Sequence, residues 1–473
     1  MQLRPYQRDL IRDAREALRT LPDGKKRIIL QAATGAGKTA IACEIVRLSA
    51  ELARHVLYTV PRLEILDQTA RKLTDNQLPH YLLRAGSSAD VGYARTVLAM
   101  SHTFDRRLPV WGSWQPDLIV VDECHANVEQ AARLAKHWPR AQILGLSATP
   151  DRLSDVRLAD VYSRVVAGPQ IRALQSAGWL VPCRVYGAAD ADLSRVGTRA
   201  GEFDARGLSA AFTQSSLLGD VIDAWRKFAT GRRTILFAAS VPHSQALVDR
   251  FRQAGIRALH VDGTTSATDR EAALEALRRG RIDVLCNVGL FVEGLDLVET
   301  EAVVLATATQ SLSKFLQMCG RGLRTSPLTA KSDLVIIDHG GNVRRHGLPD
   351  ADRLWTLDTA PVSAGTGVAP ARKCQQCGLT FGTRAHSCPS CGWRVPLPRE
   401  LPVQLQQVTQ SVDPITLSKR TPPRACPPEY RTIVAVWRDT EVIRQRYGLP
   451  LPTMRRLGYT ESHCRNHLQT LAK

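Results

Sequence analysis

Residues 27–48 read RIILQAATGAGKTAIACEIVRL, and this stretch decides the fold. It begins with a short apolar run that predicts a strand, whereas Ala40–Leu48 has the composition of a helix. Between them lies a run of small residues that includes Gly35 and Gly37 and ends in Lys38. Such a loop presents successive backbone N–H groups and a helix N-terminus to a phosphate. The stretch therefore predicts a strand–loop–helix unit that binds phosphate.

The side chains of this loop are suited to a nucleoside triphosphate with its magnesium ion. Lys38 would reach the β- and γ-phosphates, and the Thr39 hydroxyl would bind Mg²⁺. The strict pattern has glycine where Ala32 stands, so an ordinary strand–turn–helix that contains GKT is the alternative. The residues expected to surround the phosphates are Thr34, Gly35, Ala36, Gly37, Lys38 and Thr39.

A second polar cluster follows the apolar run Leu118–Val121, which predicts another strand. The next residues spell DECH and begin with Asp122 and Glu123. An acidic residue at the carboxyl end of a neighbouring parallel strand can hold Mg²⁺, so Asp122 would orient the metal. Glu123 would polarise the attacking water as a general base. A solvated acidic turn is the alternative, but the combination with the phosphate loop favours triphosphate hydrolysis.

Short apolar runs recur along the chain and predict two α/β domains. Runs rich in β-branched residues alternate with helix-period segments, which is typical of parallel sheets covered by helices on both faces. The first series of expected strands is Arg27–Leu30, Val56–Thr59, Val97–Met100, Leu118–Val121 and Ile143–Leu146. The second series is Ile235–Phe237, Ala258–Val261, Val284–Asn287, Val303–Ala306 and Leu334–Ile337. We therefore expect one domain over residues 1–167 and another over residues 216–359.

The remaining segments differ in composition. Residues 168–215 are less regular and richer in Gly, Asp and Ser, so we expect a connector with an insertion. Residues 360–371 read APVSAGTGVAPA, the composition of a flexible linker. Residues 372–397 carry four closely spaced cysteines, and residues 398–473 are basic, first proline-rich and then helical in pattern. The end of this last segment fits either a helix-turn-helix or a plain helical hairpin.

The cysteine-rich segment predicts a small zinc ribbon. Cys374 and Cys377 form one CxxC pair, Cys388 and Cys391 form another, and ten residues separate the pairs. Four thiolates at this spacing suit a tetrahedral structural Zn²⁺. Rubredoxin-like iron sites use similar pairs and are the alternative metal. With its basic flanks the ribbon could contact nucleic acid or a partner, or it could only stabilise the fold.

Several motifs carry a family resemblance. The DECH sequence and the SATP sequence at Ser147–Pro150 resemble motifs II and III of superfamily 2 helicases. AATGAGKT is similar to motif I of that superfamily, in which alanine often stands at the position of Ala32. Leu3–Gln7 resembles the adenine-recognition motif, and Val60–Arg62 resembles motif Ia, which lies along the bound strand. The resemblance thus implies that Gln7 contacts the adenine edge, that Arg4 or, alternatively, Tyr6 stacks on the ring, and that Arg62 contacts nucleic acid.

The second half of the chain carries the remaining motifs. QMCGRGLR, at Gln317–Arg324, is similar to motif VI, although a basic helix face is the alternative. The resemblance implies that Arg324 reaches the γ-phosphate with Arg321 close by, as an arginine finger does. EGLD, at Glu293–Asp296, resembles motif V and implies that Gly294 and Asp296 lie near the nucleotide. The residues expected to couple the nucleotide site to the bound strand are His125, Ser147, Thr149 and Gln317.

These motifs occur in order from Leu3 to Asn342, and the chain looks most like RadD-type bacterial DNA repair ATPases and their phage relatives. The resemblance implies two tandem RecA-like domains that close on ATP and Mg²⁺. We expect an ATP-dependent DNA helicase or translocase that acts in repair, recombination or replication, with recombination or replication proteins as partners. Two alternatives stay open: an RNA-remodelling ATPase, and an ATP-switched DNA-binding recruitment protein that displaces no strand.

The charge of the chain agrees with a polyanionic partner. The formal net charge is +18, and from Pro370 onward 16 Lys and Arg stand against 6 Asp and Glu. Such an excess suits nucleic acid or an anionic membrane surface. No run of about 18 apolar residues and no secretory signal is present, so we expect no membrane partner and a cytoplasmic protein. The 11 cysteines are then thiols or metal ligands, and we expect DNA rather than RNA because no RNA-recognition signature occurs.

Overall fold

The computed structural model describes most of the chain up to residue 395 and leaves the C-terminal segment out. The described residues are 2–87, 91, 93–108, 111, 113–150, 156–187, 191–199, 201–213, 215–292, 294, 297–357, 371–383 and 385–395. The predicted linker (except Ala371), the predicted C-terminal helices and Asp296 therefore lie outside the described residues.

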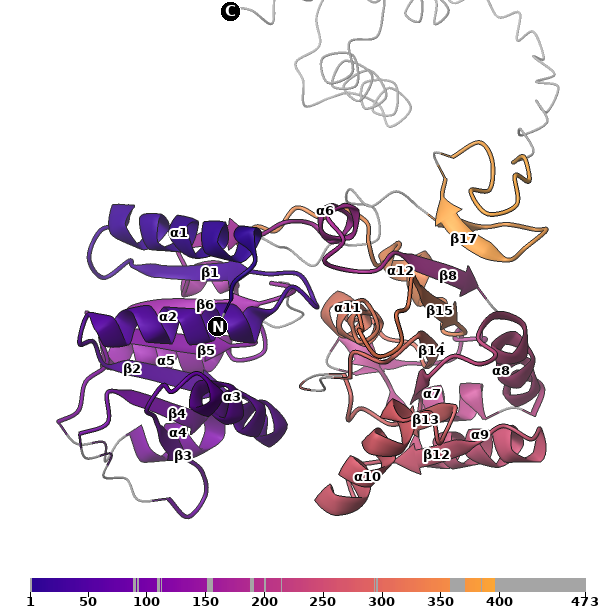
Figure 1. Ribbon diagram of the computed structural model, residues 1–473, viewed down its shortest axis with the longest axis horizontal. Coiled ribbons are helices and arrows are strands. Elements are labelled where there is room, and N and C mark those ends of the chain that lie inside the picture. The colour runs from indigo at the N-terminus through magenta and orange to yellow at the C-terminus, as the bar shows by residue number, and fades with distance from the viewer. Residues whose placement is uncertain are drawn as a thin grey trace, which may run out of the picture. The chain divides into compact units, whose positions relative to one another are not determined.

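The first domain is built on one parallel sheet flanked by helices (Figure 1). Its strand order is β3-β4-β2-β5-β6-β1-β7, and every neighbouring pair runs parallel. The strands are β1 (Arg27–Gln31), β2 (Val56–Val60), β3 (Tyr81–Leu83), β4 (Thr96–Met100), β5 (Leu118–Asp122), β6 (Gln142–Ser147) and β7 (Arg164–Ala167). The helices are α1 (Pro5–Thr20), α2 (Lys38–Glu51), α3 (Leu63–Asp75), α4 (Ser101–Arg107) and α5 (Val128–His137). All five predicted strands are confirmed, and the loops at their carboxyl ends carry the predicted polar clusters.

The second domain is built on a mostly parallel sheet of the order β12-β13-β11-β14-β15-β8-β17-β16. Its strands are β8 (Cys183–Gly187), β11 (Thr234–Ala238), β12 (Ala258–Val261), β13 (Val284–Asn287), β14 (Ala302–Ala306), β15 (Leu334–Asp338), β16 (Ala371–Lys373) and β17 (Leu379–Gly382). Its helices are α7 (Ala205–Phe212), α8 (Ser215–Phe228), α9 (Val241–Gln253), α10 (Ala267–Arg278), α11 (Leu312–Gly320) and α12 (Asn342–His346). A short hairpin, β9 (Thr198–Arg199) and β10 (Glu202–Phe203), precedes α7. The second set of five predicted strands is also confirmed.

The segment predicted as a connector, residues 168–215, takes part in the second domain. It contains α6 (Ile171–Ser176) and then β8, which pairs in parallel with β15 over its full length. The ribbon strand β17 in turn pairs antiparallel with β8. The sequence does not predict β8, because only Val185 of its five residues is buried and no apolar run indicates a strand.

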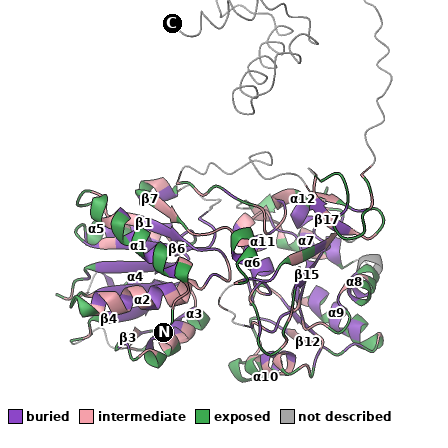
Figure 2. Ribbon diagram, turned by 45° about the horizontal axis from the view of Figure 1, so that its top comes forward, coloured by how far each residue is buried: buried purple, intermediate pink, exposed green. Residues whose placement is uncertain are grey.

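Burial follows the pattern expected of sheets covered on both faces. Strands β2, β5, β11, β14 and β15 are buried along their whole length, and Figure 2 shows buried strands such as β15 between helices that are exposed on one side. Helix α1 is an example of such a cover, because its buried residues recur at helical spacing: Gln7, Leu10, Ile11, Ala14 and Ala17. Within the described residues, no helix combines the length and the apolar character that crossing a bilayer would require.

Candidate functional site

The phosphate loop joins β1 to α2, as the sequence predicts. Gly35 and Gly37 both have φ of 86°, a left-handed conformation that glycine adopts without strain. A Cβ atom at Gly37 would lie 2.5 Å from Nε2 of Gln7, so the loop also needs glycine there to fit against α1. Lys38 and Thr39 begin α2, with Gly37 as its N-cap. The loop therefore has the backbone form that a phosphate-binding loop requires.

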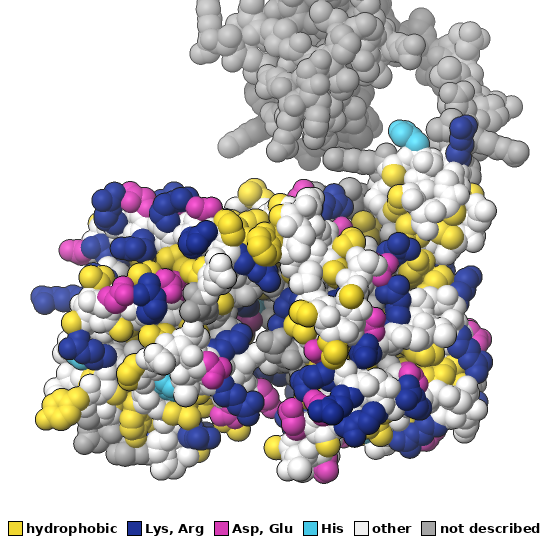
Figure 3. Space-filling model, viewed as in Figure 1, with side chains coloured by type: hydrophobic (Ala, Val, Ile, Leu, Met, Phe, Trp, Pro, Cys, Tyr) yellow, Lys and Arg dark blue, Asp and Glu magenta, His cyan; other side chains and the backbone are white. Residues whose placement is uncertain are grey.

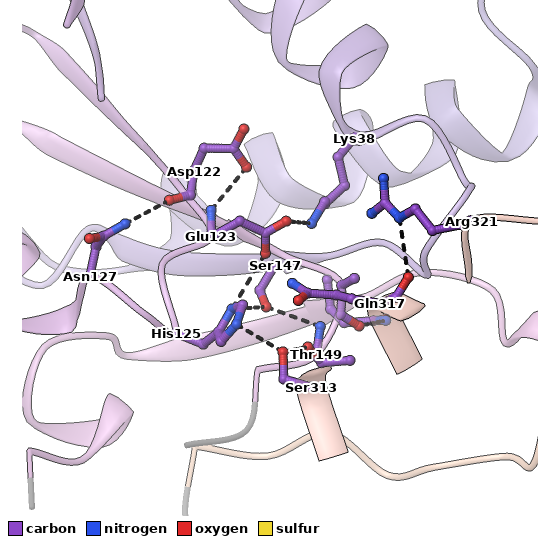
Figure 4. Close-up of polar contacts among 12 residues, drawn as sticks. Lys38, Asp122, Glu123, His125, Asn127, Ser147, Thr149, Ser313, Gln317 and Arg321 are labelled. Carbon is purple, nitrogen blue, oxygen red and sulfur yellow. Dashed lines mark hydrogen bonds and ion pairs between the residues drawn. The ribbon is translucent and has the colours of Figure 1, made fainter. Parts of the chain in front are cut away.

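The acidic pair lies at the carboxyl end of β5 and faces this loop. Lys38 forms a largely buried ion pair with Glu123 (Figure 4). Asp122 accepts a 2.9 Å hydrogen bond from the backbone N–H of Glu123, whose φ of 44° is uncommon for a residue with a side chain. An unusual conformation at this position is what a functional constraint would leave.

Burial and charge move the two carboxyl groups in opposite directions. Burial, aided by the charge of Glu123, raises the pKa of Asp122 to about 6. Burial also acts to raise the pKa of Glu123, but the charges of Lys38 and His125 outweigh it and leave that pKa below its usual value. Near neutral pH both groups are anionic, so Asp122 can bind a divalent cation and Glu123 can accept a proton.

A chain of hydrogen bonds connects the DECH segment to the second domain. Nδ1 of His125 lies 2.9 Å from the Ser147 hydroxyl, which accepts a hydrogen bond from the backbone N–H of Thr149. Nε2 of His125 lies 2.9 Å from the hydroxyl of Ser313 in α11, and this hydroxyl lies 2.6 Å from that of Thr149 (Figure 4). Three predicted coupling residues thus meet around Ser313. No sequence pattern marks Ser313, because a serine in a helix is common.

The fourth predicted coupling residue and the two predicted arginines follow in motif VI. Gln317 is buried in α11, and its backbone carbonyl accepts a hydrogen bond from Nε of Arg321 (Figure 4). The charge of Arg321 also contributes to lowering the pKa of Glu123. A Cβ atom at Gly35 would lie 3.3 Å from Cγ of Arg324. Arg324 therefore comes close to the phosphate loop, and Arg321 comes close to the acidic pair.

The predicted adenine-contact residues pack against the loop. The side-chain amide of Gln7 donates a 2.8 Å hydrogen bond to the Ala36 carbonyl, and the Tyr6 hydroxyl donates to the same oxygen. Oε1 of Gln7 accepts from the backbone N–H of Arg4. The guanidinium of Arg4 lies over the ring of Trp179, a residue that sequence reasoning did not single out for the site.

The remaining predicted residues lie around α3. Arg62 is the N-cap of this helix. Two positions further on, Glu64 forms a 2.8 Å ion pair with Arg270 of the second domain. A Cβ atom at Gly294 would lie 3.1 Å from Ile65, so this glycine of motif V lies beside α3.

The four ribbon cysteines come together. Their sulfur atoms all lie within 4.8 Å of one another. Gly378 and Gly392, which follow the two CxxC pairs, both have positive φ and form the tight turns of such a ribbon. Four sulfur donors at this distance are compatible with tetrahedral zinc.

Comparison with known proteins agrees with this geometry. Residues 1–152 match the family "Type III restriction enzyme, res subunit", and residues 215–326 match the family "Helicase conserved C-terminal domain". A 51.5 kDa protein of a Lactococcus phage is 29% identical over 77% of this chain and 77% of its own length. The putative ATP-dependent helicase IRC3 of Saccharomyces cerevisiae is 27% identical over 68% of this chain but only 49% of its own length.

Solved structures share the fold at low sequence identity. A fragment of a putative HsdR subunit of a type I restriction enzyme from Vibrio vulnificus has a TM-score of 0.57 and 20% identity, covering 74% of this chain and 66% of that one. The ATP-dependent restriction-modification enzyme LlaBIII, bound to DNA, has a TM-score of 0.54 and 16% identity, covering 71% and 28%. The paired RecA-like fold is therefore shared with these restriction enzymes, while this chain spans only part of their length.

Proposed function

Because this chain belongs to superfamily 2 of the helicases, we propose that it hydrolyses ATP in response to DNA and uses the energy to move along DNA or to remodel it. In this proposal the phosphates lie against residues 34–39, and the base lies near Arg4 and Gln7. Thr39 and Asp122 hold Mg²⁺, which supplies charge stabilisation for the phosphates. Glu123 polarises the attacking water.

The arginines complete the site from the second domain. Arg324 stabilises the charge that develops on the γ-phosphate, with Arg321 beside it; a finger of this kind is worth about 10³–10⁵ in rate in GTPases. Motif V supplies Gly294 and Asp296 near the nucleotide.

The observation that carries this proposal is the meeting of both domains at the phosphate loop. A Cβ atom at Gly320, in motif VI, would lie 2.0 Å from Cγ2 of Thr34. The Thr34 side chain thus packs directly on the backbone of Gly320, so in this proposal a nucleotide bound at the loop contacts residues of both domains. Hydrolysis then changes the contacts between the domains, which is how a chemical step becomes movement.

The ion pair between Lys38 and Glu123 supports an ordered cycle. While Lys38 neutralises Glu123, this carboxylate is a poor base for water. Arriving phosphates compete for Lys38, and Glu123 is then released to accept a proton. In this proposal Glu123 can therefore activate water only after the nucleotide has bound.

DNA as the partner is supported by charge and by the relatives. Helices α9 and α10 carry a group of arginines, and Figure 3 shows Lys and Arg side chains gathered on this part of the second domain; the group comprises Arg250, Arg252, Arg270 and Arg278. Such groups bind phosphate backbones without reading sequence. In the proposal Arg62 also contacts the strand, and the zinc ribbon contacts DNA or a repair, recombination or replication protein, as the resemblance to RadD-type ATPases suggests.

The test is an ATPase assay over a panel of single-stranded, duplex, forked and four-way DNA, with RNA in parallel. We expect DNA to stimulate hydrolysis strongly, and Lys38→Ala or Glu123→Gln to abolish it. Stimulation by RNA alone would assign an RNA-remodelling ATPase instead. DNA stimulation without displacement of a triplex strand would assign an ATP-controlled DNA-binding protein, and hydrolysis unaffected by any nucleic acid would refute the proposal.

A further inference from the structure

Trp179 begins a three-residue segment between α6 and β8 that contacts the nucleotide site on both sides. Gly178, with φ of 73°, turns the chain out of α6, and the backbone N–H groups of Trp179 and Leu180 both donate to the Leu174 carbonyl. Leu180 and Val181 are buried. The segment Trp179–Val181 is thus held in one conformation by helix α6.

On one side this segment supports the predicted adenine site. The guanidinium carbon of Arg4 lies 4.9 Å from the centroid of the Trp179 ring, within the range of a cation–π contact. Nη1 of Arg4 also donates to the Tyr6 hydroxyl, which donates to the carbonyl of Ala36 in the phosphate loop. Trp179 therefore fixes one face of the residue that is proposed to contact the base.

On the other side the segment contacts motif VI. Leu180 forms an antiparallel bridge with Arg324, and the Val181 N–H donates a 2.8 Å hydrogen bond to the Leu323 carbonyl. A Cβ atom at Gly35 would meet Leu180 Cδ2 at 3.0 Å, so Leu180 also packs against the phosphate loop. Within three residues the chain passes from the adenine side of the site to the backbone of the proposed arginine finger.

We propose that Trp179 is a positioning residue that couples adenine recognition at Arg4 to the placement of Arg324. The inference rests on the proposed ATP hydrolysis. A base stacked on the face of Arg4 opposite Trp179 restricts this side chain and, through the ring contact, Trp179. Leu180 and Val181 pair with the backbone of motif VI at Arg324 and Leu323. The arginine finger is therefore held closer to its catalytic position when adenine is bound than when another base is bound. Base identity therefore affects the rate of hydrolysis as well as binding.

The experiment compares ATP and GTP turnover for the full chain carrying Trp179→Ala, Trp179→Phe or the control Trp114→Ala. Trp114 is also half-buried but lies in the first domain beside Ala94. We expect Trp179→Ala to lower kcat/KM for ATP about tenfold, with a fall in kcat and a rise in KM, and to change GTP turnover little. Trp179→Phe keeps the aromatic face and should restore most of the preference for ATP, while the control should keep the wild-type ratio.

Equal losses for ATP and GTP would overturn the inference, because a purely structural role affects both nucleotides alike. The route through the finger is tested by combining Trp179→Ala with Arg324→Lys: we expect the loss of kcat caused by Trp179→Ala to be smaller in the combined variant, and additive losses would refute the coupling. The ratios of kcat/KM for ATP to kcat/KM for GTP are measured without DNA. A wild type that DNA fails to stimulate would therefore refute the proposed function, while the ratios still decide the role of Trp179.

Discussion

Replacing Gly320 by alanine tests whether the two domains work in the arrangement described above. The new Cβ atom would lie 2.0 Å from Thr34 Cγ2 and 2.6 Å from Thr34 Cβ. Carbon atoms in contact are separated by about 3.5–4.0 Å, so the contact with Thr34 Cβ alone requires the two backbones to separate by about 1 Å. Rotation of the Thr34 side chain does not relieve the clash, because Cβ stays where the backbone puts it.

This separation moves Arg321 and Arg324 away from the phosphate loop. Since a misplacement of about 1 Å can cost about 10²-fold in rate, we expect kcat for ATP to fall about a hundredfold. Stability should not fall in parallel, because alanine is a better helix former than glycine by about 1 kcal/mol. Steady-state ATPase rates and thermal unfolding of the same preparation measure the two effects separately.

Gly219 provides the matched control. It also lies in a helix, α8, but a Cβ atom there would meet nothing within 4 Å, so Gly219→Ala should leave the rate unchanged. Adding Thr34→Gly to Gly320→Ala removes both clashing atoms and should recover part of the lost rate. Wild-type turnover by Gly320→Ala alone would show that the domains do not approach in this way during the cycle.

Three further predictions concern the metal, the interdomain contact and the ribbon. A carboxyl with a raised pKa is protonated below that value, and only its anion binds Mg²⁺; ATP turnover should therefore fall as the pH drops through about 6, and more Mg²⁺ should move this limb to lower pH. If the pH at which ATP turnover falls does not change with the Mg²⁺ concentration, the role of Asp122 is contradicted. Ser313→Ala removes the hydroxyl between His125 and Thr149, so ATPase activity should stay within about tenfold while triplex displacement falls much further; equal losses would argue against coupling through Ser313. Cys388→Ser should abolish zinc binding, measured by atomic emission, and lower the melting temperature; an unchanged zinc content would exclude a four-cysteine site.

The sequence predicts the sheets well where a strand is buried on both faces. All ten predicted strands are present, because runs such as Leu118–Val121 are apolar throughout. Three of the overlooked strands, β3, β7 and β8, have only one buried residue each or none, so their position depends on pairing with neighbours and not on their own composition.

The residues of the candidate site also fall into those that a local sequence pattern predicts and those that it does not. Residues proposed to bind phosphate or metal, such as Lys38 and Asp122, lie at the ends of a helix and a strand, within motifs whose sequence the proposed chemistry constrains. Ser313 and Trp179 become part of the site only through contacts with residues more than 150 positions away, at Thr149 and Arg4, and no local pattern marks them. The special likeness to RadD-type ATPases stays a prediction, since the comparisons support the superfamily and not this branch of it.

The pairing of β17 with β8 has a mechanical consequence. Strand pairing continues from the second sheet into the cysteine-rich ribbon at Leu379 and Thr380, so the ribbon is attached to this sheet by backbone pairing. If the second domain rotates during a cycle, the ribbon rotates with it, and any molecule bound to the ribbon moves in the same direction. Attachment at the ribbon would thus convert nucleotide turnover into displacement of the attached molecule, even without further moving parts.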